Sequence, residues 1–71
     1  MRLGKYLTTL TKPELEELKE LLNLTDEEEK VFNELSKGRS VIMVAEKCMV
    51  STSTVDNRTK SIKEKIVRLS R

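Results

Sequence analysis

Four polar side chains between residues 53 and 60 have the types and spacing of a hydrogen-bonding surface. Ser53, Asn57 and Lys60 recur at intervals of four and three residues, and Asp56 lies beside them. At about 100° per residue, these positions share one face of an α-helix. Their hydroxyl, amide, carboxylate and ammonium groups can donate and accept hydrogen bonds, and the ammonium group can neutralise an anion. The pattern therefore indicates recognition of a polar, anionic surface.

The sequence lacks the arrangements of residues that catalysis requires. The chain has no histidine and a single cysteine, Cys48, so a cysteine nucleophile has no histidine to activate it. No cluster of cysteine, histidine or carboxylate residues resembles a metal site, and the two glycines do not form a phosphate-binding loop. The acidic run over 27–29 is explained by the start of a helix, where it complements the helix dipole. We expect no enzyme activity, metal, cofactor or small-molecule substrate, and we expect Cys48 to be a buried hydrophobic residue.

Basic side chains are concentrated near the C-terminus of the 71-residue chain. Residues 51–71 carry six basic and two acidic side chains, whereas the whole chain has a net charge of only +2. This excess either attracts an anionic partner or forms an ordinary solvated helix face. The sequence has no apolar run long enough for a membrane span or a signal peptide, and a single cysteine suits a reducing compartment. We expect a cytoplasmic protein without membrane contact.

Helix signals recur along the chain, and no strand-like alternation is present. Thr11 and Thr25 each begin a capping-box pattern, Gly38 favours a left-handed helix end, and Ser40 and Ser51 can cap two more helices. These signals predict an all-α domain of four helices, over 12–22, 26–37, 41–48 and 52–69. We divide the chain into an N-terminal extension with an amphipathic helix, over 1–24, and a helix-turn-helix domain over 25–71.

The junction between the last two predicted helices is only about three residues long, over 49–51. A junction this short makes two helices cross at a steep angle, as in a helix-turn-helix unit. Val44, Val55, Ile62 and Ile66 have the spacing to close a core beneath it, which leaves the polar face of the last helix outside. That face has the chemistry to lie in a DNA major groove, because base edges need hydrogen bonds and phosphates attract cations.

Residues 24–66 resemble the LuxR/GerE-type helix-turn-helix domain of bacterial transcription regulators. The residues shared with the family pattern fall in register without a gap: Leu24, Thr25, Glu28, Val31, Leu35, Gly38, Ser40, Ala45, Val50, Ser51, Thr54, Val55, Ile62, Lys65 and Ile66. Region 4 of sigma factors has a similar signature and is the second choice. The resemblance implies a transcriptional regulator that binds specific DNA sequences by inserting the helix over 52–69 into the major groove of a double strand.

The resemblance also implies roles for individual positions. Asp56, Asn57 and Lys60 map to the base-facing side of the last helix, and Ser53 lies on the same face. The expected phosphate contacts are Arg39, Ser40, Ser51, Thr54, Arg58 and Lys63. Asp56 replaces a residue that is usually basic in the family. It either forms an ion pair with Lys60, which we favour, or accepts a hydrogen bond from cytosine.

Three apolar residues do not fit the expected core. Ile42, Met43 and Met49 should form an apolar patch on the outside of the third predicted helix. We expect the helix over 12–22 to cover this patch. The alternative cover is a second copy of the chain or a protein partner, and the domain is then an interaction module that binds RNA polymerase or another regulator. The family adds a dimerising helix beyond the position of residue 71, and the leucines of 12–22 are a candidate substitute for a homodimer.

Overall fold

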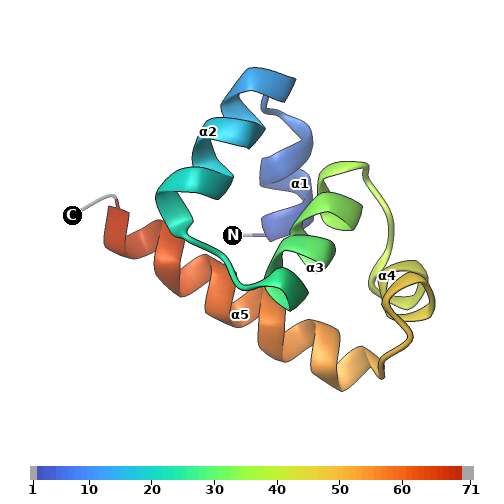
Figure 1. The fold of residues 1–71 in the computed structure, drawn as a ribbon. Helices are drawn as coiled ribbons and strands as arrows, with labels where there is room; N and C mark the ends of the chain where they lie inside the picture. The colour runs from blue at the N-terminus through green and yellow to red at the C-terminus, as the bar shows by residue number, and fades with distance from the viewer. Residues whose placement is uncertain (1, 70–71) are drawn as a thin grey trace.

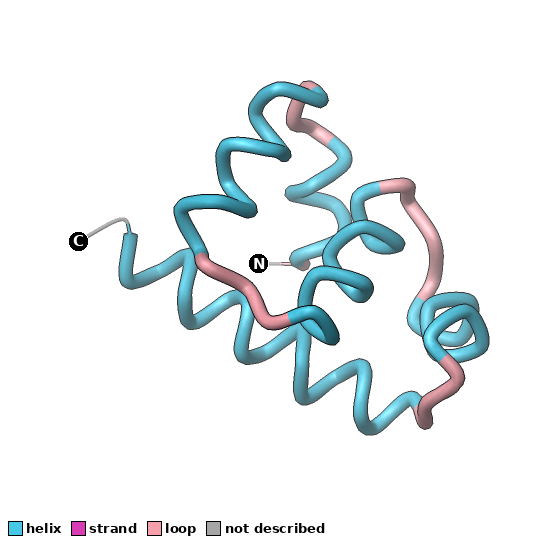
Figure 2. Tube along the Cα trace, in the orientation of Figure 1, coloured by secondary structure: helices cyan, strands magenta, loops and turns pink. Residues whose placement is uncertain are grey.

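In the computed structural model, which describes residues 2–69, the chain forms five α-helices and no β-strand (Figures 1 and 2). They are α1 (Leu3–Thr8), α2 (Lys12–Leu22), α3 (Asp26–Ser36), α4 (Val41–Cys48) and α5 (Thr52–Leu69). The bounds of α2, α4 and α5 are those predicted, and α3 ends one residue early. The predicted all-α fold with a helix-turn-helix is therefore confirmed.

Side-chain hydrogen bonds explain where three of the helices begin. Both predicted capping boxes are formed, between Thr11 and Glu14 before α2 and between Thr25 and Glu28 before α3. In each box the threonine hydroxyl accepts a hydrogen bond from the glutamate amide, and the glutamate carboxylate accepts one from the threonine amide. Ser40 caps α4 by accepting a hydrogen bond from a backbone amide of the first turn.

Left-handed residues end α3 and α4. Gly38 has a φ of 83° and Met49 a φ of 58°. The residue after each of them donates a backbone hydrogen bond to a carbonyl in the last turn of the helix. Arg39 donates to Glu34, and Val50 donates to Ala45. This is the Schellman arrangement, in which glycine is the usual left-handed residue. Gly38 meets that preference without strain, whereas Met49 adopts a conformation that costs energy for a residue with a Cβ atom.

The longest helix, α5, supports the rest of the molecule (Figure 1). Three helices pack on it: α4 beside its N-terminal end, α3 over its middle and α2 near its C-terminal end, while α1 packs against α3. Figure 1 looks nearly along α4 while α5 runs across the view, so the two helices cross at a steep angle, as the short junction predicted. This arrangement holds the polar face of α5 away from the other helices.

One hydrophobic core joins the N-terminal extension to the helix-turn-helix. Leu3, Leu7 and Leu22 are buried in the same cluster as Phe32 and Ile62. The remaining buried members are Val31, Leu35, Val44, Ala45, Val55 and Ile66. Cys48, the last residue of α4, packs against this core as predicted but is only partly buried.

Helix α1 was not predicted, and the prediction of four helices is wrong in this respect. Its six residues are fewer than an isolated helix needs, and no side chain of Arg2 caps its start. Leu3 and Leu7, one turn apart, are nevertheless almost completely buried. Local sequence signals do not predict a helix in this segment. Burial against α3 stabilises it, because tertiary packing supplies most helical stability.

The predicted cover of the apolar patch is also wrong. Ile42, Met43 and Met49 are 66%, 43% and 91% exposed. Helix α2, the expected cover, packs against α5 instead and buries Leu22 there, with Leu15 and Leu18 partly buried against the core. Helix α2 and its leucines therefore pack at the opposite end of the molecule from the α4–α5 turn (Figure 1).

Candidate nucleic-acid interface

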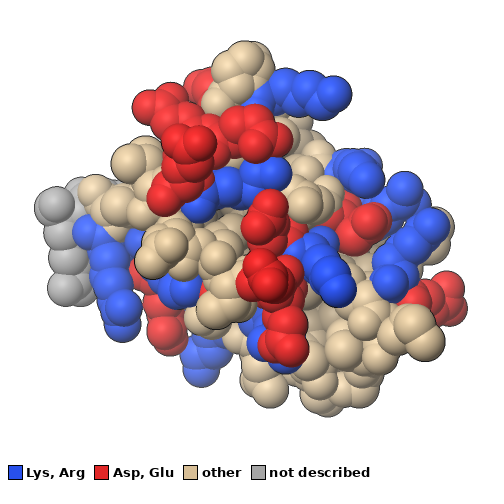
Figure 3. Space-filling model, in the orientation of Figure 1, with Lys and Arg blue, Asp and Glu red and all other residues tan. Residues whose placement is uncertain are grey.

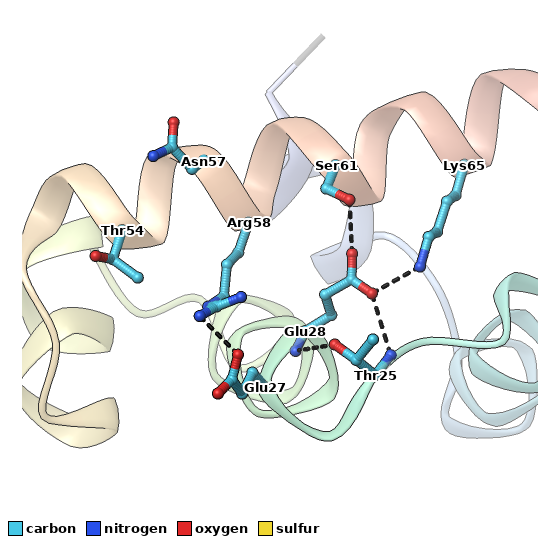
Figure 4. A pocket seen from close by; sticks show the side chains of 8 residues that line it. All are labelled: Thr25, Glu27, Glu28, Thr54, Asn57, Arg58, Ser61 and Lys65. Atoms are coloured by element: carbon cyan, nitrogen blue, oxygen red, sulfur yellow. Dashed lines mark hydrogen bonds and ion pairs between the residues drawn. The ribbon is translucent and has the colours of Figure 1, made fainter.

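The outer face of α5 presents all four of the residues expected to face DNA bases. Ser53, Asp56, Asn57 and Lys60 are each exposed. Figure 4 shows the Asn57 side chain pointing away from α3, on the open side of the helix. The face begins in the first turn of α5, which starts three residues beyond the left-handed Met49, so the tight α4–α5 turn determines the direction in which α5 projects. The structure thus gathers these four side chains on one accessible surface.

Ser51 and Thr54 organise the first turn of α5. The Ser51 hydroxyl accepts a hydrogen bond from the Thr54 amide and lies 3.0 Å from the Thr54 hydroxyl. This cap leaves a small polar surface at the start of the helix. Figure 3 shows that the surface over the first turns of α5 is largely uncharged, while acidic side chains gather over α2 and the start of α3. Phosphates therefore meet less repulsion at the start of α5 than over α2.

The flank of α5 that faces α3 is occupied by ion pairs (Figure 4). Arg58, an expected phosphate contact, lies 2.7 Å from the carboxylate of Glu27. One and two turns further along, Ser61 and Lys65 donate hydrogen bonds to Glu28, at 2.7 and 2.6 Å. The acidic start of α3 thus neutralises two cations of the basic helix. Capping and the helix dipole explained this acidic run in the sequence, and its contacts with α5 were not predicted.

Glu28 is buried, and both of its carboxylate oxygens accept hydrogen bonds. It is 5% exposed and receives hydrogen bonds from Lys65, from Ser61 and from the Thr25 amide. Burial by itself would raise the pKa of Glu28, but these hydrogen bonds and the nearby positive charge outweigh it and lower the pKa to about 2. The residue is therefore ionised at neutral pH, and it joins the start of α3 to the middle of α5.

The opposite flank of α5 faces the start of α4 and carries Asp56 and Lys63. Within the described part of the chain, Lys63 has no ion pair, and the expected ion pair between Asp56 and Lys60 is not formed. Arg39, before α4, is paired with Glu34. Ser40 is exposed and caps α4. Asp56 instead lines the groove to which Arg39 and Lys63 also contribute.

The six expected phosphate contacts therefore fall into four places. Ser51 and Thr54 lie at the start of α5, Arg39 and Ser40 lie before α4, and Arg58 and Lys63 lie on opposite flanks of α5. Two of the three cations, Arg39 and Arg58, are held by glutamates of α3. Over residues 2–69, no group of cysteine, histidine, aspartate or glutamate side chains has the arrangement of a metal site. None of the helices in this range could cross a membrane.

A helix-turn-helix with a polar, exposed second helix defines a class of DNA-binding domain. Comparison with known families agrees with this class: the GerE model, described as bacterial regulatory proteins of the luxR family, matches residues 22–71. The chain therefore belongs to the LuxR family of bacterial regulatory proteins, and it is a DNA-binding transcriptional regulator. No curated protein and no solved structure matches the chain significantly.

Proposed function

We propose that the protein reads specific DNA sequences by placing the first turns of α5 in the major groove. The observation that carries this proposal is the exposed row of Ser53, Asp56, Asn57 and Lys60 on the helix that follows the α4–α5 turn. An α-helix with its side chains is about 10–12 Å across, and the major groove is about 12 Å wide. The amide of Asn57 has the donor and acceptor needed to read adenine, and Lys60 can donate to guanine.

Phosphate binding in this proposal begins with side chains that need no rearrangement. Ser40, Ser51 and Thr54 surround the starts of α4 and α5, and Lys63 has no ion pair in the described chain. Arg58 can join them by exchanging Glu27 for a phosphate. This exchange costs little, because Glu27 is exposed and ion pairs at the surface contribute about 0–1 kcal/mol. Arg39 is held more firmly, because the Glu34 side chain that it pairs with is only 18% exposed.

A second candidate function is supported by the apolar patch of Ile42, Met43 and Met49. These side chains lie exposed on α4 and at its end, and α2 does not cover them. In this alternative the helix-turn-helix is a scaffold, and the patch docks on RNA polymerase or another regulator. An apolar interface of this kind depends weakly on salt, whereas binding through phosphate contacts weakens steeply as salt rises.

An amide chemical-shift titration separates the two functions. The labelled protein is titrated with a mixed-sequence DNA duplex at about 50 and 200 mM salt. DNA reading predicts shifts at 39–40 and 51–60 that weaken at the higher salt. Asn57→Ala and Lys60→Ala should then reduce affinity, while Ile42→Ser and Met43→Ser should leave it unchanged. A folded protein without shifts at low salt would contradict the proposal and direct attention to a protein partner.

A further inference from the structure

We propose that the N-terminal segment formed by Arg2 and α1, which lies outside the family match, takes part in DNA binding by supplying Arg2 and Lys5 to a backbone phosphate site. The inference rests on the proposed function of α5 and extends it to a segment outside the matched residues 22–71. The site is an open groove between α1, the α3–α4 turn and α5, with a volume of about 580 Å³. We call it the α1 groove.

The α1 groove is strongly biased toward positive charge. Two basic residues come from the N-terminal segment, one from the α3–α4 turn and one from α5: Arg2, Lys5, Arg39 and Lys63. Asp56 is the one acidic side chain among its described lining residues. Arg39 is paired with Glu34, but Arg2, Lys5 and Lys63 have no ion pair among residues 2–69. Three unpaired cations around one groove favour an anionic ligand.

The position of the groove identifies that ligand. Asp56 belongs both to the base-facing row of α5 and to the lining of the α1 groove, so the two surfaces are continuous. Ser40, at the start of α4, lies on the same lining. A helix that fills the major groove has a phosphate strand along each of its flanks. The strand on the Asp56–Lys63 flank would therefore run along the α1 groove.

The two flanks of α5 differ in a way that supports this assignment. On the flank that faces α3, Arg58 and Lys65 are paired with Glu27 and Glu28. On the flank that faces α1, Lys63 is unpaired and the N-terminal segment adds Arg2 and Lys5. A DNA strand on the first flank must compete with two carboxylates for their cations, whereas a strand on the second flank meets three unpaired cations and the single carboxylate of Asp56. The second flank is thus the better phosphate site, and half of its cations come from Arg2 and Lys5.

The test compares two double variants of the full chain that lose the same charge. Arg2→Ala/Lys5→Ala removes the contribution of α1 to the groove, and Lys12→Ala/Lys30→Ala removes two exposed lysines that do not line it. Affinity for a labelled mixed-sequence duplex is measured by fluorescence anisotropy from about 50 to 200 mM salt. Arg2 and Lys5 are exposed, so both variants should keep the helical circular dichroism of the unmodified chain.

The expected result is a smaller salt dependence for the α1 variant alone. Each lost phosphate contact reduces the slope of log affinity against log salt by about 0.9, so the slope should fall by about 1–2 and affinity by about tenfold or more. The charge-retaining variant Arg2→Lys/Lys5→Arg should keep the original slope. Equal losses in the α1 and control variants would overturn the inference while leaving the function of α5 intact. Absence of binding by the unmodified chain at low salt would overturn both.

Discussion

Arg58 of α5 and Glu27 of α3 form an ion pair at 2.7 Å, with 30% of the arginine side chain and 68% of the glutamate side chain exposed. The pair joins the helix proposed to read DNA to the acidic start of its neighbour (Figure 4). Under the proposed function the arginine contacts a phosphate, so the glutamate would compete with DNA for it. DNA affinity would then depend on the charge of Glu27.

Glu27→Gln should therefore strengthen DNA binding. Loss of the carboxylate frees Arg58, and an exposed ion pair is worth up to about 1 kcal/mol, which corresponds to an affinity gain of about two- to fivefold. The free energy of unfolding should change by less than about 1 kcal/mol. Anisotropy titrations measure the gain, and Glu17→Gln, an exposed change of the same charge on α2, is the matched control. An equal gain in both variants would show that net charge alone is responsible.

Asp56→Asn should distinguish repulsion from base reading. The change removes the acidic charge from the α1 groove and from the base-facing row, so affinity for mixed-sequence DNA should rise by about threefold. If Asp56 accepts a hydrogen bond from cytosine, affinity for the preferred site should instead fall, by about 1–3 kcal/mol at that base pair. Selection of preferred sites from a random pool, with both forms of the protein, measures the two effects separately.

Because of Glu28, the free energy of unfolding should decrease at acidic pH. Its pKa is about 2 in the folded state and near its usual 4.5 in the unfolded chain. The folded state therefore binds the proton less tightly, so the stabilisation is fully present above pH 4.5 and is lost as the pH falls toward 2. The pKa difference corresponds to at most roughly 3.5 kcal/mol. Urea unfolding at a series of pH values between 6 and 2 measures this loss.

A pair of variants assigns that pH dependence to Glu28. Glu28→Gln should reduce stability at neutral pH by about 1–3 kcal/mol and flatten the decline below pH 4.5. Glu14 is the natural control, because it forms the equivalent capping box before α2 but is fully exposed. The Thr11 amide, followed by the Thr11 hydroxyl, lowers the pKa of Glu14 through hydrogen bonds. Glu14→Gln should have a clearly smaller effect, and equal effects would argue against a special role for Glu28.

Met49→Gly should stabilise the protein. Met49 is left-handed with a φ of 58° and is 91% exposed, so glycine relieves backbone strain without opening a cavity. The expected gain in the free energy of unfolding is about 1 kcal/mol. Met43→Gly, in the interior of α4, should cost about 1 kcal/mol instead. Urea unfolding curves with an unchanged slope would check both values, and a loss of stability in Met49→Gly would contradict the strain argument.

Met49→Gly also bears on the apolar patch, because Met49 is its most exposed member. Unchanged DNA binding in this variant would place the patch outside the DNA interface. The observed exposure already shows that α2 is not the cover. A protein partner or a second copy of the chain remains the proposal for that surface.

The helix starts and ends could be predicted because their signals are local. A capping box joins residues three apart, and a left-handed glycine acts within the last turn, so Thr11, Thr25 and Gly38 reveal their roles in the sequence itself. The outward face of α5 could be predicted for the same reason, because helical periodicity places Asn57 opposite Val55 and Ile62. The sequence alone therefore determined four of the five helices, the α4–α5 turn and the candidate base-facing row.

The remaining features depend on segments that are distant in the sequence and meet only in the folded chain. Ser61 and Glu28 are 33 residues apart, and no local pattern indicates that they share a hydrogen bond. Helix α1 is too short to form without Leu3 and Leu7 in the core, so its existence and the α1 groove depend on packing against α3. Local hydrogen bonds and periodicity thus define this protein's helices, whereas tertiary packing decided which of its cations are neutralised and which stay free.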